Sequence, residues 1–273
     1  MTTLQSPSIL LQPIDKWTPE HLDFLQVDDG QPFMFLSNIT VETDQADDEF
    51  LGYFLIPTQD VLNFLHHRSR NRTNPFRLTF SYLHRVLDVA DDPRPQMGLI
   101  ESLLEVLLSF SPRRTRLYGI QLRNGRQLMK YRVTKRAESL KFGSLRIKCD
   151  GLFKQDQWTL VPVATFLVLK GSGDNKIRET QQILAQAILA FAQQPEMDEF
   201  IGFVVCSTGT ALYLAGAHIT RGYIESLRKY QRPSLRFQVC RSATYDLKIP
   251  DGRKDVAMLL LRMLKYLDER KLP

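Results

Sequence analysis

The pattern of apolar and polar positions predicts alternating helices and strands over the second two-thirds of the chain. Leucine and isoleucine recur with helical spacing between residues 99 and 108, which predicts a helix over 97–110. A second helix is expected over 175–193, with an apolar face from Ile183 to Phe191. Further helices are expected over 220–230 and 256–267.

Apolar runs of strand length lie between these helices. We expect strands at residues 117–122, 127–133, 145–153, 160–169, 200–206, 211–215 and 235–240. Asn124-Gly125 separates the first two runs and predicts a β-hairpin, and Thr208-Gly209 predicts a second one. The run 160–169 is almost entirely apolar, which is typical of a central buried strand. The order indicates an α/β fold with one mixed central sheet flanked by helices.

The N-terminal third is less regular. Residues 1–31 are expected to be irregular, apart from a short helix that begins after Thr18. Two strand-like runs, Pro32–Val41 and Phe50–Ile56, flank an acidic stretch, Glu42–Glu49, that is expected to form a loop. A helix is expected from Thr58 to His66, and residues 76–88 fit a helix or a strand equally well. Prolines at 93 and 95 indicate a linker, so residues 1–95 are interpreted as an acidic N-terminal elaboration packed on a domain of residues 96–273.

Composition describes an ordinary globular protein, with 43% hydrophobic and 24% charged residues in 273. No apolar run reaches the roughly 18 residues of a membrane helix, and no secretory signal is visible. We therefore expect an intracellular protein, nuclear or cytoplasmic and not secreted. Its three cysteines are far apart in apolar runs and are expected to be reduced thiols in the core.

Charge is distributed unevenly behind a net charge of +6. Residues 1–60 hold eleven acids against one base, a balance of −10, and residues 111–148 hold twelve bases against one acid, a balance of +11. A basic stretch with interleaved aromatic residues suits phosphate contact and base stacking, although a charge run can also be a solvated face. The candidate nucleic-acid-binding residues are Arg113, Arg114, Arg116, Arg123, Arg126, Lys130 and Arg132. The acidic stretch Asp44–Glu49 is a candidate lid over this basic ribbon.

The stretch 143–182 carries the main family resemblance. One predicted strand ends at Asp150, the next ends at Lys170, and a helix with Gln181 and Gln182 follows, while Glu101 and Glu105 lie on the preceding helix. This order resembles the PD-(D/E)XK, or restriction-endonuclease-like, nuclease superfamily. There an Asp closes one strand, an acidic-x-Lys triplet closes the next, and a Gln-bearing helix follows. The segment 203–213 also looks like nuclease-like proteins encoded in fungal genomes.

The resemblance implies a restriction-endonuclease-like core and a set of site residues. The implied catalytic residues are Asp150, Lys170, Glu179 and Gln182, and the implied ligands of Mg²⁺ or Mn²⁺ are Asp150, Glu179, Glu101 and Glu105. Position 168, where the triplet has its acid, is a valine. Some members of the superfamily carry this carboxylate on the following helix, which makes Glu179 the candidate here. Each candidate also has a structural explanation. Asp150 fits a residue of a turn, and Glu179 fits an acid that the helix dipole favours in the first turn. Glu101 and Glu105 fit the solvated face of a helix.

Two functional hypotheses follow. The preferred one is a pseudo-nuclease that binds nucleic acid through its basic face, with an impaired or lost metal site. The alternative is an active Mg²⁺-dependent nuclease with the second carboxylate on the following helix. DNA and RNA both remain open as ligands, and protein partners or a homo-oligomer are compatible with either hypothesis.

Overall fold

The computed structural model describes residues 17–30, 36, 45–57, 60, 74–89, 92–110, 121–131, 145–154, 162–169, 175–229 and 231–269. The helices within these ranges are α1 (Pro19–Phe24), α3 (Gln45–Gly52), α5 (Arg77–Asp88), α6 (Pro93–Phe110), α7 (Asn175–Gln193), α8 (Arg221–Arg228) and α9 (Pro250–Glu269). The strands are β1 (Val27–Asp29), β2 (Gln121–Tyr131), β3 (Leu145–Lys154), β4 (Pro162–Val168), β5 (Glu199–Thr208), β6 (Ala211–Thr220), β7 (Phe237–Arg241) and β8 (Tyr245–Asp246).

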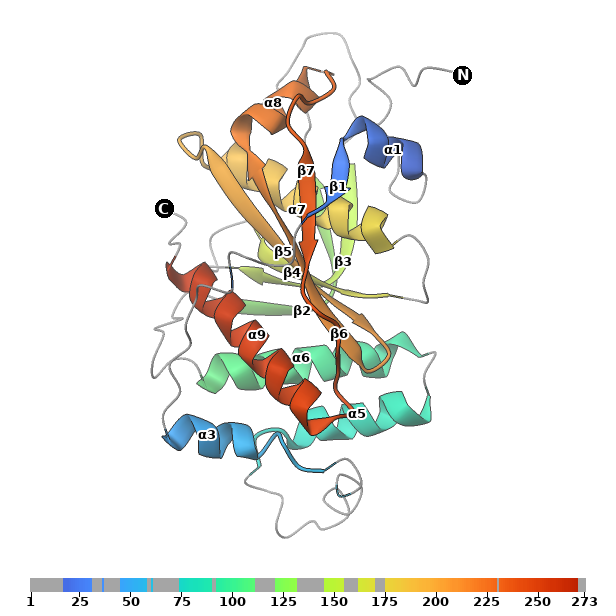
Figure 1. Ribbon diagram of the computed structural model, residues 1–273, viewed down its shortest axis with the longest axis vertical. Coiled ribbons are helices and arrows are strands. Elements are labelled where there is room, and N and C mark those ends of the chain that lie inside the picture. The colour runs from blue at the N-terminus through green and yellow to red at the C-terminus, as the bar shows by residue number, and fades with distance from the viewer. Residues whose placement is uncertain are drawn as a thin grey trace.

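Within this described part of the chain, eight strands form one mixed sheet in the order β1-β7-β6-β5-β4-β3-β2, with β8 paired to β6. β4 is parallel to β5 and β1 is parallel to β7, whereas the other pairs are antiparallel. The parallel connection from β4 to β5 needs a crossover, and α7 provides it. The protein is therefore an α/β fold with helices on both faces of a mixed sheet (Figure 1).

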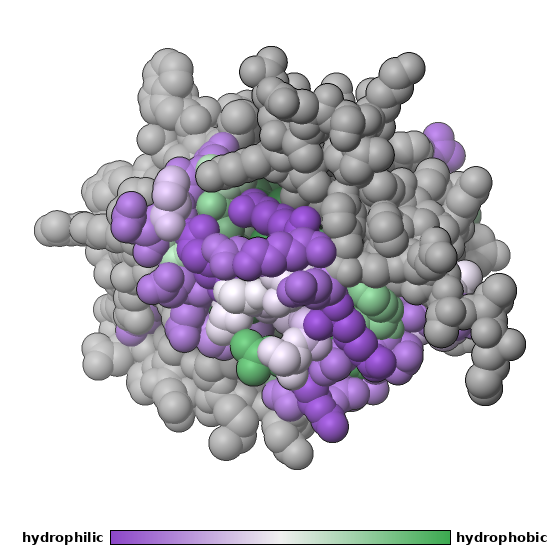
Figure 2. All heavy atoms as spheres, turned by 90° about the horizontal axis from the view of Figure 1, so that it is seen from above, coloured by the Kyte–Doolittle hydropathy of each residue, from purple (hydrophilic) through white to green (hydrophobic). Residues whose placement is uncertain are grey.

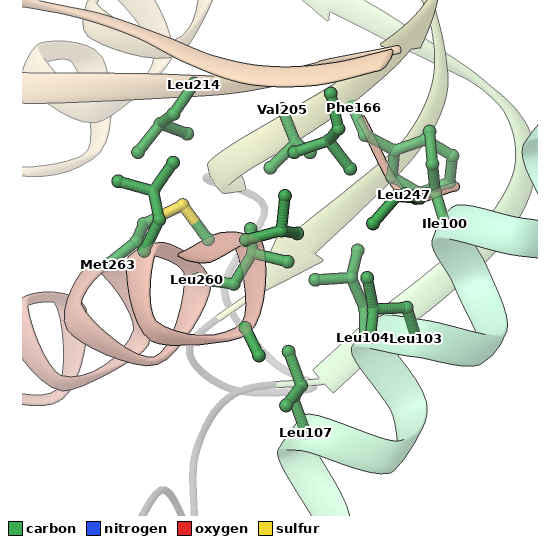
Figure 3. Close-up of a cluster of buried hydrophobic side chains, with 14 of the residues drawn as sticks. Ile100, Leu103, Leu104, Leu107, Phe166, Val205, Leu214, Leu247, Leu260 and Met263 are labelled. Carbon is green, nitrogen blue, oxygen red and sulfur yellow. The ribbon is translucent and has the colours of Figure 1, made fainter. Parts of the chain in front are cut away.

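The two faces of the sheet carry separate hydrophobic clusters because strand residues alternate between them. On β4, Phe166 and Val168 belong to the first cluster, whereas Leu167 and Leu169 belong to the second. The first cluster is completed by α5, α6 and α9. Figure 3 shows leucines of α6 and α9 beside side chains of β4, β5 and β6. The second is completed by α7, α8 and the α1–β1 segment. The apolar strand β4 is thus buried on both sides, as its sequence predicts.

Arg253 of α9 ties the N-terminal residues to the first face. The Arg253 side chain is fully buried and donates hydrogen bonds to the carbonyl oxygens of Phe54 (2.7 Å) and Ile56. It also donates to the carbonyl oxygen of Leu247 (2.8 Å), and its guanidinium lies 5.6 Å from the ring centroid of Phe80. Residues 51–56 therefore pack on the same core as the sheet.

Several predictions are confirmed. The helices at 97–110, 175–193 and 220–230 form as α6, α7 and α8, and the hairpin at Thr208-Gly209 joins β5 to β6. Gly209 has φ +59°, the left-handed conformation that favours glycine in such a turn. The ambiguous run 76–88 is a helix, α5. Cys149, Cys206 and Cys240 are free thiols, the first two of them buried.

Several local predictions are wrong. Val27–Asp29, expected to be irregular, forms the strand β1 beside β7. α6 begins at Pro93, so Pro93 and Pro95 lie in its first turn, where proline is tolerated, and do not mark a linker. Residues 121–131 form one continuous strand through Asn124-Gly125, which pairs with β3 and has an irregular register between Asn124 and Gln127. Pairing along β3 therefore outweighs the local hairpin signal, and the register irregularity absorbs the Asn-Gly pair. Phe50–Ile56 is not a strand, because Gln45–Gly52 is helical and Phe54 follows in a turn. The acidic stretch up to Glu49 is therefore partly helix. The predicted strand at 32–41 and the helix at 58–66 fall almost wholly outside the described residues.

Candidate functional site

A buried polar site lies where the first turns of α7 meet β6 and β7. Glu179 of α7 is 0% exposed, and both of its carboxylate oxygens accept hydrogen bonds. The Tyr213 hydroxyl on β6 donates to Oε1 at 2.5 Å. Arg241 at the end of β7 donates to Oε2 from Nε at 2.8 Å and approaches it with Nη2 at 2.6 Å. Two nitrogens of Arg241 thus contact Glu179 and compensate the negative charge of this buried carboxylate.

The cluster continues outward to the protein surface through Arg241. Its remaining nitrogen, Nη1, donates to Oδ1 of Asp29 on β1 at 2.6 Å. Lys176 in the first turn of α7 donates to the other oxygen, Oδ2, at 3.1 Å. The Asp29 side chain is 65% exposed and that of Arg241 29% exposed. The arginine therefore joins a buried acid to a solvent-accessible one.

The protonation states follow from these surroundings. Burial alone would lower the pKa of Arg241, but the hydrogen bond and charge of Glu179, followed by those of Asp29, raise it above its ordinary value. The hydrogen bond from Arg241 is the main reason that the pKa of Asp29 is lowered. Burial raises the pKa of Tyr213, with a further contribution from the charge of Glu179, so its hydroxyl remains a donor. Arg241 and Asp29 are therefore charged at neutral pH.

Cys206, the thiol beside this cluster, has no nucleophilic character. It is fully buried on β5, and burial raises its pKa well above the ordinary value, with a further contribution from Glu179. A thiolate is the reactive form of cysteine, so this environment makes the residue inert. The cluster is suited to holding charge and has no activated nucleophile among these residues.

Three glutamines of α7, at 181, 182 and 186, are buried, and Gln186 contacts the sheet. Gln186 is fully buried and donates to Thr165 Oγ1 at 2.9 Å and to the carbonyl oxygen of Phe203 at 3.0 Å. Its Oε1 accepts from the Phe203 backbone N–H at 3.2 Å. Gln182, a predicted catalytic residue, is buried on the same helix one turn earlier. Gln186 thus fixes α7 to the two parallel strands β4 and β5, a role that the sequence did not indicate.

The predicted metal ligands lie on different parts of the fold. Asp150 lies in β3, and its neighbour Gly151 pairs with Phe166 of β4. The Asp150 side chain and the whole of Lys170 fall outside the described residues. Glu101 is half-buried and Glu105 exposed on α6. α6 covers the first face of the sheet and α7 the second, so the structure does not bring these two acids together with Glu179.

Position 168 is decisive for the idea that Glu179 replaces a missing acid. The Val168 side chain is 5% exposed and belongs to the first cluster, on the side of α6 and α9. Glu179 lies on the opposite face, where it contacts β6 and β7. Its carboxylate therefore does not occupy the point to which a side chain at 168 is directed. Among the described residues, no three His, Cys, Asp or Glu side chains are grouped so that they could hold a metal ion.

The predicted nucleic-acid-binding residues remain predictions. Arg123, Arg126 and Lys130 lie along β2, at the end of the strand order, and their side chains are not among those described. Arg113, Arg114, Arg116 and Arg132 fall outside the described residues altogether. No helix in the described ranges is long and apolar enough to cross a membrane.

Sequence reasoning found Glu179 but missed its partners. Arg241, Tyr213 and Asp29 come from strands far apart in the chain and form no local motif. The available signal was the presence of Glu179 beside the apolar face of a largely buried helix, because such a carboxylate requires a cationic partner. Comparison of the sequence with protein-family models gives no match, and comparison with curated proteins gives no significant match.

Proposed function

We propose that the chain is a nuclease-fold protein that binds nucleic acid through its basic stretch, residues 111–148, and has an impaired or lost metal site. The proposed core is restriction-endonuclease-like. Its support is the order of elements, in which α6 is followed by three antiparallel strands, β2, β3 and β4, then by α7 and the parallel strand β5. The strand that carries Asp150 and the strand that leads to Lys170 are neighbours in the sheet, as the resemblance requires.

One observation carries the choice of a non-catalytic protein. Glu179, the candidate for the missing carboxylate, has one oxygen bound to Tyr213 and the other to Arg241, on the face opposite the Val168 side chain. A magnesium ligand has to present an oxygen lone pair to the ion at about 2.0–2.1 Å. Arg241 competes for that oxygen with a fixed positive charge, which also repels a divalent cation. Asp150 would then be the principal remaining strand-borne carboxylate, and a single carboxylate holds Mg²⁺ weakly.

Nucleic-acid binding rests on charge. Twelve bases against one acid in residues 111–148 include Arg123, Arg126 and Lys130, which follow one another on β2, the outermost strand of the sheet within the described residues. An edge ribbon can follow a phosphate backbone, and the affinity then falls as salt rises because counterions are released. The Glu179 cluster lies on α7, β6 and β7, toward the other end of the described strand order from β2, and we expect binding without a metal.

The test measures binding and cleavage of single-stranded and duplex DNA and RNA, with and without Mg²⁺ or Mn²⁺. We expect binding without metal-dependent cleavage. Lys130→Gln with Arg132→Gln should weaken binding and reduce the slope of log affinity against log salt by about 1.4–1.8, since each phosphate contact contributes about 0.7–0.9. Lys229→Gln with Lys254→Gln, at exposed positions on α8's end and α9, removes the same charge elsewhere and is the matched control.

Two results would contradict the proposal. Equal slopes for the two double variants would remove the basic stretch as the binding surface. Metal-dependent cleavage that disappears in Asp150→Ala and in Lys170→Ala would establish the active nuclease instead.

A further inference from the structure

The segment of residues 17–30, called here the N-terminal segment, is bound to the edge of the sheet as a peptide would be. β1 adds to β7 in parallel through three residue pairs. The Gly30 N–H donates to the carbonyl oxygen of Val239 at 3.0 Å, and the buried Tyr223 hydroxyl donates to that of Leu25 at 2.6 Å. Trp17, Leu25 and Val27 are buried in the second cluster. Strand addition of this kind combines backbone hydrogen bonds with side-chain contacts that give specificity.

Three of the four acids of the N-terminal segment meet bases of the body, whereas the fourth, Glu20, accepts a hydrogen bond from Thr18 of the same segment. Asp23 pairs with Arg232 at 3.6 Å, and Asp28 pairs with Arg236 at 2.7 Å. Asp29 pairs with Arg241 and Lys176 together. Hydrophilic side chains predominate on the end of the molecule that α1 and α8 form (Figure 2). The N-terminal segment thus covers a basic surface of the chain, one that is different from the basic stretch at 111–148.

The pairs at this surface differ in how they are built. Arg236 is 71% exposed and meets a single carboxylate. Arg241, by contrast, is held by the buried Glu179 through two nitrogens, and it directs its third nitrogen to the same carboxylate that Lys176 contacts. Two cations that contact the separate oxygens of one anion, with one of the cations already held in place, suit a phosphate group as well as a carboxylate.

The local charge shows what Asp29 does there. The bases are Lys176, Arg178 and Arg241, and Arg178 also donates to the Val168 carbonyl oxygen at 3.4 Å. The acids are Glu179 and Asp29, so three positive and two negative charges leave +1, and +2 when Asp29 is removed. Asp29 supplies an anion to a site that otherwise carries an excess of positive charge. Its side chain is 65% exposed, so solvent and solutes reach the site.

We infer that Lys176 and Arg241 form a phosphate-binding site and that Asp29 of the N-terminal segment occupies it in place of a phosphate group. The ligand is a phosphate group, either free or carried by nucleic acid. In the second case the inference rests on the proposed function, and it adds a phosphate contact that the N-terminal segment controls. Displacement of Asp29 admits the phosphate, and the phosphate competes with docking of β1.

The test compares the parent with Asp29→Asn, Asp28→Asn, and Asp29→Asn combined with Lys176→Gln. Asp28→Asn is the matched control, because it removes the same charge from the same strand. Asp28 contacts Arg236, whereas Asp29 contacts Lys176 and Arg241. Arg241 is left intact because it also neutralises Glu179. The probes are inorganic phosphate, followed by the rise in thermal unfolding midpoint at fixed ionic strength, and a fluorescein-labelled single-stranded oligonucleotide, followed by anisotropy.

We expect Asp29→Asn to bind inorganic phosphate about two- to fivefold more tightly than the parent, the range in which exposed ion pairs contribute. Asp28→Asn should match the parent, and the combined variant should return to the parent's affinity. If the gain extends to the oligonucleotide, the ligand is a nucleic-acid phosphate, and if it is confined to inorganic phosphate, the ligand is a free phosphate group. Equal phosphate affinity for Asp29→Asn and Asp28→Asn overturns the inference. Failure of every variant to bind the oligonucleotide, with the phosphate gain intact, contradicts only the proposed function.

Discussion

Arg253 and Arg241 are two arginines held inside one protein by opposite means. Arg253, on the α9 face, gives its hydrogen bonds to backbone carbonyl oxygens, and burial lowers its pKa to about 10. Arg241, on the α7 face, meets carboxylates at both ends, and their hydrogen bonds and charges raise its pKa although burial opposes them. Burial therefore dominates the pKa of Arg253, whereas the carboxylates outweigh burial in the pKa of Arg241.

The difference separates a structural role from a binding role. A dissolved anion cannot replace the backbone carbonyl oxygens that Arg253 contacts. Arg253 therefore joins the segment around Phe54 to the turn around Leu247 in a fixed way. A surface carboxylate can be displaced by another anion, and Asp29 is the outer partner of Arg241. The arginine that keeps one replaceable partner at the surface is the one suited to bind a ligand.

Arg253→Met sharpens the structural side of this comparison and should have the largest effect. It leaves the carbonyl oxygens of Phe54 and Leu247, and those beside them, without their guanidinium donor. Each buried acceptor without a partner costs about 1–3 kcal/mol, so we expect a loss of about 3–5 kcal/mol in the free energy of unfolding, measured in urea. Arg253→Lys keeps the charge but not the planar donor fork and should lose less. An unchanged urea midpoint for Arg253→Met would contradict this structural role.

The carboxylate-paired arginine should respond differently to replacement of its partner. We expect Glu179→Leu to cost about 2–3 kcal/mol, below the roughly 3–5 kcal/mol for a fully enclosed pair, because Arg241 is partly hydrated. Glu179→Leu combined with Arg241→Leu should cost no more than the single change, since both charges leave together. A double-mutant cycle in urea measures this coupling. Strictly additive losses would show that Glu179 and Arg241 do not act as a pair.

The fold was more predictable than the site because its signals are local. The spacing of leucines at 99–108 and the apolar run at 160–169 fix a helix and a buried strand without knowledge of their partners. The Asn124-Gly125 signal failed because pairing with β3 along the whole strand outweighed a two-residue turn preference. The run Phe50–Ile56 predicts a strand, although the spacing of Phe50, Leu51 and Phe54 also fits one helical face, which meets the core formed with α5.

The site could be predicted only where chain order supplied it. Glu179 was found from its place after the Lys170 strand, whereas Arg241 lies 62 residues further on and Asp29 lies 212 residues before Arg241. Their meeting depends on two facts of topology: β7 lies beside β6, and β1 adds to β7 in parallel. Neither pairing follows from the pattern of apolar and polar residues. Charge asymmetry predicted a different pairing, of the stretch Asp44–Glu49 with the basic stretch 111–148, and that lid stays a prediction. The described pairs join Asp23, Asp28 and Asp29 to bases outside that stretch.

The smallest expected effect is the loss of stability on replacement of Asp29, the outer partner of Arg241, and it depends on pH. The hydrogen bond from Arg241 lowers the pKa of Asp29 below 3.8, so Asp29 stabilises the folded state when pH is above the unfolded value. This contribution is lost as pH falls through the lower folded pKa. We therefore expect the parent to exceed Asp29→Asn by no more than about 1 kcal/mol in free energy of unfolding. The difference should be constant above about pH 5 and should vanish in stronger acid. It is measured by urea unfolding of both proteins at each pH where both are folded. A difference that grows on acidification would mean that Asp29 is held by something other than Arg241 and Lys176.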